Sequence, residues 1–223
     1  MPTSLAFDVY GTLIDTHGVM VALEPQVGPQ AGAFSRVWRD KQLEYSFRRG
    51  LMRQYEPFSI CTSQALDHTC ALFGLHLSPE GRQGLLDAYQ TLPAFPDAAE
   101  GLTQARKAGF RLFAFSNGRA DAVEALLVQA GLRDYFLEVV SVDEVQSFKP
   151  NPEVYAHFLR RAGTVGSEAW MISGNPFDVL GALGAGMRAA WVQRSPETPF
   201  DPWGVEPTLT VRSLLDLATR IRP

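Results

Sequence analysis

The sequence predicts an α/β fold in which a parallel sheet is covered by helices on both faces. Short β-rich runs alternate with helical patterns, as βαβ units require. The helical patterns each end on a glycine, a common stop signal for helices. The expected strands lie at 4–8, 111–116, 137–142, 169–173 and 189–193, and the expected helices at 97–109, 120–131 and 151–163.

A long interval after the first strand breaks this alternation. Within it, residues 33–55 and 62–75 have helical apolar spacing and little strand character. Stretches with turn-forming residues at 15–18 and 91–97 provide plausible edges for an insertion. The predicted organisation is a core of residues 1–15 and 93–223 with a helical insertion of residues 16–92.

The composition and net charge indicate which kind of protein this is and which partners it is expected to lack. Apolar residues make up 46% of the 223 residues and charged residues 20%, which is typical of a globular chain. A formal net charge of -4 does not provide the basic surface that nucleic-acid binding needs, so we expect no nucleic-acid partner. The sequence has neither a membrane-length apolar run nor a signal-peptide pattern at its N-terminus, so we expect a cytoplasmic protein without a membrane partner. Cys61 and Cys70 match no metal or redox spacing and are expected to be buried free thiols.

Polar residues follow four of the predicted strands, at the edge of a parallel sheet where loops and helix N-termini converge. Asp8 ends the first strand, and a carboxylate at the end of a buried strand must be hydrogen-bonded or catalytic. We expect the turn "YGTL" to aim backbone N–H groups at Asp8 and Thr12 to donate its hydroxyl to it. The other polar residues are Ser116 and Asn117 after the second strand, Lys149 after the third, and Ser173, Asn175 and Asp178 after the fourth.

The types of these residues suggest a nucleophile with supporting groups. We expect Ser116 to donate a hydrogen bond to Asp8, and Asn117 to donate to a bound or departing anion. Lys149 precedes two prolines in "FKPNP", which limit the directions in which its ammonium group points. Turn capping, ordinary turn chemistry and a solvated lysine are the alternatives for these residues taken singly. Their common position at strand ends favours a catalytic site.

Four motifs in order, "FDVYGTLID", "FSNG", "FKPNPEVY" and "SGNPFDVLGALGAGM", resemble the haloacid dehalogenase superfamily over nearly the whole chain. The resemblance implies a Rossmann-like, doubly wound parallel core with an inserted helical cap. Most members of that superfamily are Mg²⁺-dependent phosphatases that carry a second aspartate as acid/base. Here Tyr10 stands at that position, and Asn175 stands where the metal-binding pattern usually has an aspartate. A tyrosine substitutes poorly for a carboxyl acid/base near neutral pH.

This pair of substitutions resembles the L-2-haloacid dehalogenase branch, whose motif is Asp-x-Tyr-Gly-Thr, and residues 38–52 resemble its cap segment. The resemblance implies a homodimeric hydrolase, without metal or cofactor, that converts short L-2-haloacids into D-2-hydroxy acids and halide. It implies that Asp8 displaces the halide and forms an ester. Because no proton must be given to a halide, the second aspartate is not needed, and Tyr10 can serve as a pocket wall.

The same resemblance implies roles for the remaining residues. Arg39 and Asn117 receive the halide, while Lys149 and Ser116 hold carboxylates together with backbone amides near the strand-four loop. Lys149 lies between Asp8 and Asp178 and keeps both ionised. Water positioned by Asp178, Lys149 and Asn175 hydrolyses the ester. Supporting positions for the lysine and the water are Tyr155 and Ser173, and the other pocket walls are Leu43, Phe58 and Phe177.

Two residues depart from the branch pattern. Asp40 follows the halide-binding arginine, where a neutral polar residue is frequent, and we expect it to point outward as half of a solvated ion pair. If Asp40 faced the pocket instead, it would weaken the field of Arg39. Gly174 stands where a second serine is frequent.

Three other functions remain open from the sequence. The first is a Mg²⁺-dependent phosphatase acting on a small metabolite, and the second is a hydrolase of another carbon electrophile such as a strained amine ring. Halide release in EDTA, compared with Mg²⁺-dependent turnover of an aryl phosphate, separates the phosphatase from a dehalogenase. The third is a non-catalytic binding protein. An Asp8→Asn variant that bound small carboxylates unchanged, beside an inactive wild type, would favour this last alternative.

Overall fold

The computed structural model describes residues 2–222, so residues 1 and 223 of the predicted core lie outside the described part. A six-stranded parallel sheet has the order β3-β2-β1-β4-β5-β6. The five expected strands are confirmed to within one residue at each end, and β6 was not expected. The strands are β1 (Ser4–Phe7), β2 (Arg111–Ser116), β3 (Glu138–Ser141), β4 (Ala169–Ser173), β5 (Arg188–Val192) and β6 (Leu209–Val211).

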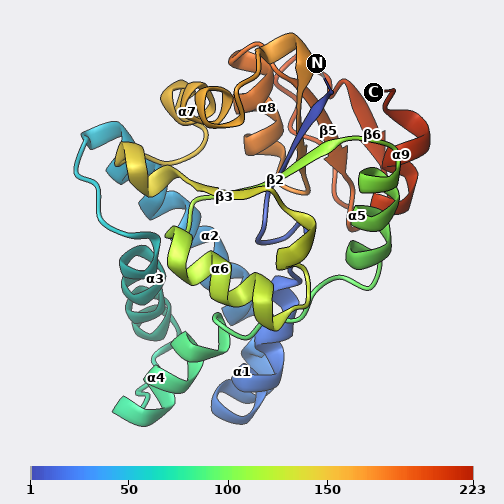
Figure 1. Cartoon of the computed structure of the whole chain (residues 1–223). Coiled ribbons are helices and arrows are strands. Elements are labelled where there is room, and N and C mark those ends of the chain that lie inside the picture. The colour runs from blue at the N-terminus through green and yellow to red at the C-terminus, as the bar shows by residue number, and fades with distance from the viewer. Residues whose placement is uncertain (1, 223) are drawn as a thin grey trace.

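Within residues 16–88, after β1, the structure assigns helices joined by loops; α1 and α4 lie at the bottom of Figure 1, and α2 and α3 lie above them towards the left. The two helical patterns expected there correspond to α2 and α3. These elements are η1 (Thr16–Val19), α1 (Met20–Val27), η2 (Gly28–Gln30), α2 (Ala31–Met52), α3 (Phe58–Phe73) and α4 (Pro79–Ala88).

The helices around the sheet include the three that the sequence predicts, α5, α6 and α7. The sequence patterns did not single out α8 or α9. The elements are α5 (Ala98–Lys107), α6 (Ala120–Gln129), η3 (Arg133–Tyr135), η4 (Val142–Val145), α7 (Pro152–Ala162), η5 (Gly166–Glu168), α8 (Pro176–Gly184), η6 (Leu214–Asp216) and α9 (Leu217–Arg220). As predicted, α7 ends at a glycine: Gly163 has φ +56° and donates its N–H to the last carbonyls of the helix.

The sheet is buried on both faces, which explains why its strands are nearly continuous apolar runs. All four residues of β1 are buried. Because side chains alternate along a strand, Leu5 and Phe7 pack in the apolar cluster that includes α5 and α6. Ala6 lies in the second cluster, with residues of α7 and α8. Full burial of one such large apolar side chain stabilises the fold by about 1.5–3 kcal/mol.

The strand order creates a crevice next to β1. The chain runs from β1 to β2 and β3 on one side of the sheet, and then crosses back to β4 on the other side of β1. The loops after β1 and β4 therefore lead away in different directions, which opens a crevice at the carboxyl ends of these strands. Asp8 directly follows β1 and Ser173 ends β4, so both lie at this switch point.

Two further expectations concern single elements. Both cysteines are free thiols, as predicted; Cys61 is buried and Cys70 is half-buried. Across residues 2–222, no helix combines the length and the apolar character needed to cross a bilayer.

Candidate active site

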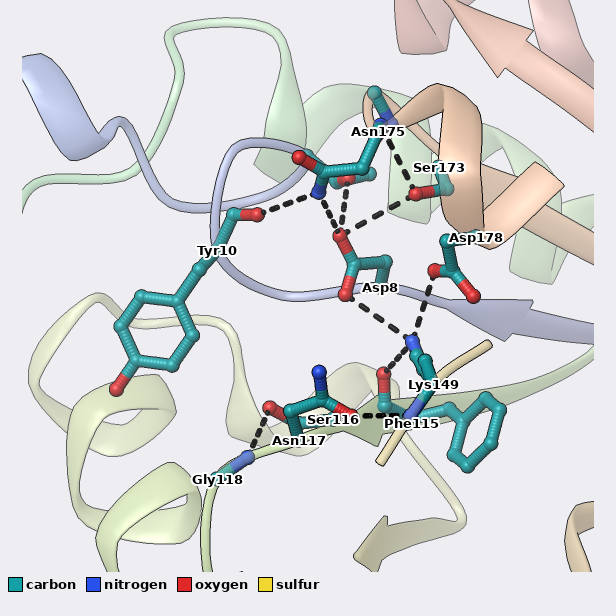
Figure 2. Close-up of polar contacts among 12 residues, drawn as sticks. Asp8, Tyr10, Phe115, Ser116, Asn117, Gly118, Lys149, Ser173, Asn175 and Asp178 are labelled. Carbon is teal, nitrogen blue, oxygen red and sulfur yellow. Dashed lines mark hydrogen bonds and ion pairs between the residues drawn. The ribbon is translucent and has the colours of Figure 1, made fainter. Parts of the chain in front are cut away.

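The Asp8 carboxylate is the centre of a hydrogen-bond network at the switch point (Figure 2). Its Oδ2 accepts from Thr12 Oγ1 at 2.9 Å, from Asn175 Nδ2 at 2.7 Å and from Ser173 Oγ at 3.3 Å. Its Oδ1 accepts from Lys149 Nζ at 3.2 Å. The residue is only 7% exposed, so these four donors replace the water that a buried charge loses. The predicted hydroxyl contact of Thr12 is confirmed.

Lys149 lies between two carboxylates, as the sequence predicts. Its ammonium donates to Asp8 Oδ1, to Asp178 Oδ2 at 2.9 Å and to the Phe115 carbonyl at 2.8 Å. It also lies 4.3 Å from the centroid of the Phe115 ring, which favours a cation. The three N–H groups are all used and the residue is 1% exposed, so the charge is held at a fixed point.

Asp178 is fully buried behind this lysine and is held by Tyr155. The Tyr155 hydroxyl donates to Asp178 Oδ1 at 2.9 Å and contacts the Asp178 carbonyl at 3.2 Å. Burial raises the pKa of Asp178 to about 6; Lys149 opposes the shift and Asp8 adds to it. Asp178 is therefore mostly ionised at neutral pH, yet close enough to its pKa to accept a proton. Tyr155, expected near the lysine, acts on it through Asp178.

Asn117 is oriented by the backbone of the lysine loop. Its Oδ1 accepts from the Lys149 N–H at 3.0 Å (Figure 2), which leaves the two N–H donors of its amide for a ligand. The neighbouring Ser116 differs from expectation. Its Oγ accepts from the Gly118 N–H at 3.1 Å, and among the described residues no hydrogen bond joins it to Asp8. The tight turn after β2 uses the hydroxyl oxygen as its own cap.

Among the described residues no backbone amide of the first turn donates a hydrogen bond to Asp8, contrary to the sequence prediction. The Gly11 N–H donates to the Ile14 carbonyl at 2.8 Å, and the Thr12 N–H donates to the Val9 carbonyl at 3.3 Å. These bonds close the turn on itself. The donors to Asp8 are side chains instead.

The strand-four loop is joined to the Asp8 turn by a close backbone approach. The Gly174 N–H donates to Thr12 Oγ1 at 2.8 Å, and the Asn175 N–H donates to Ser173 Oγ at 3.1 Å. A Cβ on Gly174 would lie 2.3 Å from the Gly11 carbonyl oxygen, far inside van der Waals contact. The glycine that departs from the family pattern is thus required by the packing of these two loops.

Tyr10 turns its ring away from Asp8 (Figure 2). Its backbone carbonyl accepts from Asn175 Nδ2 at 3.0 Å, while its side chain lines a cavity of about 350 Å³. Burial raises the pKa of the phenol to about 12, against the lowering effect of Arg39. The hydroxyl stays protonated at physiological pH and is not positioned to exchange protons with Asp8. Tyr10 is a pocket wall, as expected, and Phe58 lines the same cavity.

Arg39 lies on α2, near Tyr10 and Tyr89. Its Nη1 donates to Gln42 Oε1 at 3.5 Å, and its charge opposes the rise in pKa that burial causes at Tyr10 and Tyr89. Within residues 2–222 it makes no hydrogen bond to the Asp8 network. Asp40 is exposed, as predicted, although no ion pair of Asp40 occurs in the described chain.

The remaining predicted pocket residues are dispersed. Leu43 is half-buried on α2 and is not among the residues that line the 350 Å³ cavity. Phe177 packs against Phe47 with ring centroids 5.0 Å apart and lines a different cavity, of about 410 Å³, with Trp203. Three further residues line the Tyr10 cavity but were not predicted from the sequence. Their spacing along the chain is also typical of residues in an ordinary helical core. They are Thr62, Leu86 and Tyr89.

The donor set does not fit magnesium, which prefers octahedral oxygen ligands. The Asn175 amide nitrogen faces two oxygens, Asp8 Oδ2 and the Tyr10 carbonyl, so the hydrogen bonds fix its orientation. The Lys149 ammonium meets the other Asp8 oxygen. In the part of the chain that is described, no three His, Cys, Asp or Glu side chains are grouped to hold a metal ion. Positive charge at Asp8 comes from the lysine.

Comparison with known proteins agrees with this arrangement. The sequence model of the haloacid dehalogenase-like hydrolases matches residues 3–186. An (S)-2-haloacid dehalogenase of Pseudomonas putida is 36% identical over 96% of this chain and 94% of its own. Haloacetate dehalogenase H-2 of a Moraxella strain is 35% identical over 93% of this chain and 92% of its own.

A solved structure extends the likeness to the whole fold. The L-2-haloacid dehalogenase from Xanthobacter autotrophicus, with chloropropionic acid covalently bound, superposes with a TM-score of 0.91 at 33% identity, covering 98% of each chain. The family match, the relatives and this superposition cover both the sheet and the helical segment. The chain therefore belongs to the haloacid dehalogenase-like hydrolases, in the family of the (S)-2-haloacid dehalogenases.

Proposed function

We propose that this chain hydrolyses short L-2-haloacids to D-2-hydroxy acids through an ester on Asp8. The observation that carries the proposal is the buried Asp8 carboxylate, held by four donors, with a tyrosine rather than a second carboxylate beside it. The Xanthobacter relative with covalently bound chloropropionic acid supports a covalent route.

In the first step the Asp8 carboxylate forms a C–O bond to C2 of the haloacid while the carbon–halogen bond breaks. The halide leaves with the bonding electrons, and attack from the opposite side inverts C2. Asn117 donates to the departing halide through its free amide N–H groups, and Arg39, near Tyr10, supplies positive charge to receive it. Ser116 and Lys149 hold carboxylates in place, and Tyr10 and Phe58, which line the 350 Å³ cavity, exclude water.

In the second step a water molecule, positioned by Asn175, Lys149 and Asp178, attacks the carbonyl carbon of the Asp8 ester. Asp178 accepts the proton of the water, and Tyr155 holds Asp178 in orientation. The acyl C–O bond breaks and the C2 oxygen takes up the proton held by Asp178, so the hydroxy acid leaves. Asp8 is restored as a carboxylate with an oxygen from water, and its remaining proton passes to solvent. Ser173 and Thr12 stabilise the developing charge on the Asp8 oxygens.

The experiment that tests this function is a halide-release panel. L-2-chloropropionate should be turned over in EDTA, whereas the D enantiomer should not. Chloroacetate and fluoroacetate belong in the panel because one relative is a haloacetate dehalogenase. Turnover of an aryl phosphate with Mg²⁺, without halide release, would contradict the proposal. The two curated relatives described above are both dehalogenases, which supports this function over the phosphatase alternative.

The acid limb of the pH profile should report Asp178. Because the ionised form must accept a proton from water, turnover should fall about tenfold per pH unit below a midpoint no higher than about 6, since the ester removes the Asp8 charge that helps raise the pKa of Asp178. The folded pKa of Asp178 is raised, so this group favours folding at low pH and loses that contribution as pH rises through about 6. Acid inactivation of this kind should therefore be reversible, with unchanged circular dichroism. A profile that stays flat well below pH 6 would exclude Asp178 from the rate-determining steps.

Gly174→Ala should lower turnover by about tenfold or more, because the added Cβ displaces the loop that carries the Asp8 donors. The matched control is Gly184→Ala, at the end of α8, where a Cβ meets nothing within 4 Å. Halide release and melting temperature should be measured for both. Equal activity of the two variants would show that the close approach at Gly174 does not hold the site.

We also propose that residues 16–92 act as a cap on the core formed by residues 1–15 and 93–223, and that the protein is a cytoplasmic homodimer. Val21 and Leu51 are apolar side chains of α1 and α2 that are 82% and 86% exposed, which supports a partner surface on the helical segment. Light scattering should give twice the chain mass, and introducing a charge at Leu51 should reduce it. Cell fractionation tests the compartment.

A further inference from the structure

The position of the Lys149 ammonium depends on the path of the segment that precedes it. After β3 the chain forms η4, and Gln146 then adopts a left-handed conformation with φ 48°. Ser147, Phe148 and Lys149 follow as buried residues. Since Lys149 Nζ contacts two carboxylates, a small movement of residues 143–148 changes the distances that define the site.

A side chain from the helical segment holds residues 143–148 at two points. Tyr55, in the loop between α2 and α3, donates its hydroxyl to Asp143 Oδ1 at 2.6 Å, across 88 positions of sequence. Its ring lies 4.9 Å from the Phe148 ring, centroid to centroid, next to the catalytic lysine. The end of α2 is close as well, because a Cβ on Gly50 would lie 3.9 Å from the Phe148 nitrogen.

We propose that Tyr55 is a positioning residue for Lys149. Its hydrogen bond to Asp143 and its packing on Phe148 fix residues 143–148 against the helical segment, and so fix the ammonium between Asp8 and Asp178. Its effect on turnover rests on the proposed function; its effect on the lysine segment does not. The Tyr55–Asp143 pair thereby couples the helical segment to the charge that the chemistry needs.

The hydrogen bond from Tyr55 to Asp143 persists over the working pH range. Burial, followed by the hydrogen bond to Asp143, raises the pKa of Tyr55 well above its ordinary value. Cys61 adds to that shift in pKa, and Arg119 opposes it. The hydroxyl therefore remains a donor throughout the working pH range, and a hydrogen bond from a phenol to a carboxylate is among the stronger kinds.

Loss of the Tyr55–Asp143 contact should change the pKa of Asp178, a residue that Tyr55 does not contact. The groups facing Asp178 are Lys149, which lowers its pKa, Asp8, which raises it, and Tyr155, whose hydrogen bond lowers it. If the ammonium moves away, the pKa of Asp178 rises further. The acid limb of the pH profile then shifts to higher pH, which a loss of overall stability alone would not produce.

The test compares Tyr55→Phe, which keeps the ring, with Asp143→Ala and Asp143→Asn. The carboxamide of Asp143→Asn still accepts the Tyr55 hydroxyl, so this variant should restore most of the activity. The matched control is Tyr135→Phe, which removes a tyrosine hydroxyl that accepts from Thr103 at 3.2 Å. Tyr135 precedes β3, whereas Asp143 follows it, so the two lie at opposite ends of this strand. Two measurements are made on each protein: L-2-chloropropionate turnover against pH, and amide hydrogen exchange of residues 142–149.

Tyr55→Phe and Asp143→Ala should each lower kcat by about tenfold, with KM changed less than about twofold, and shift the acid limb upward. Combining them should cost no more than either alone, because they remove the same contact. Exchange in residues 142–149 should accelerate in both and not in Tyr135→Phe. Wild-type kinetics, pH profile and exchange in Tyr55→Phe would overturn the proposal. If the wild type releases no halide, the proposed function fails, while the exchange data still decide whether Tyr55 holds the lysine segment.

Discussion

The Asp8→Asn variant should release halide from L-2-chloropropionate at least about 10⁴-fold more slowly than the wild type, because a carboxamide is not a nucleophile towards carbon. The fold should survive. The oxygen of the new carboxamide can accept from the donors that now meet Asp8 Oδ2, namely Thr12, Ser173 and Asn175. Its NH₂ group then faces Lys149 Nζ, so a modest fall in melting temperature is expected.

The matched control is Asp134→Asn, the same substitution at an exposed aspartate before β3. It should leave turnover and melting temperature unchanged. Residual turnover of Asp8→Asn above about one per cent, in protein whose mass confirms the amide, would contradict a nucleophilic role for Asp8.

Replacing the catalytic lysine should damage both turnover and stability. Lys149→Met fills the same space but leaves Asp8 and Asp178 buried without their shared cation. Breaking such a buried pair destabilises a protein by about 3–5 kcal/mol. Turnover should fall by about 10³-fold, because the ammonium also positions the attacking groups.

The loss of stability in Lys149→Met should increase as pH rises. Without the ammonium the pKa of Asp178 rises above its value of about 6, so the carboxyl is protonated in mild acid and costs little there. The variant should thus be closest to wild type in stability near pH 5, and the difference should grow as pH rises. Lys107→Met, at an exposed position at the end of α5, is the control. Equal losses at acid and alkaline pH would contradict the ion-pair assignment.

The sequence predicted the strands and the composition of the site because both follow from local chemistry. Parallel strands that are buried on two faces have nearly continuous apolar sequences. Because β1 lies between β2 and β4, the polar residues at the carboxyl ends of these strands come together. Asp8, Lys149, Ser173, Asn175 and Asp178 do meet there.

The features that the sequence did not predict depend on loop paths and helix packing. The Ser116 hydroxyl caps its own turn, and the amides after Asp8 close theirs, because each loop satisfies its own backbone first. The cavity beside Tyr10 is walled by residues of α3 and α4, such as Leu86, whose spacing also fits an ordinary core. β6 has only three residues and follows a proline-rich loop, so the sequence is too short there to show a strand pattern.

The measurement that tests the central claim most directly is single-turnover hydrolysis of L-2-chloropropionate in H₂¹⁸O, with enzyme in excess. An ester on Asp8, hydrolysed at its carbonyl carbon, must leave the label in the Asp8 carboxylate and none in the D-lactate released. Mass spectrometry of the peptide containing Asp8 should show one heavy oxygen. Label appearing in the product, with an unlabelled Asp8 peptide, would mean that water attacks C2 directly and would contradict the account.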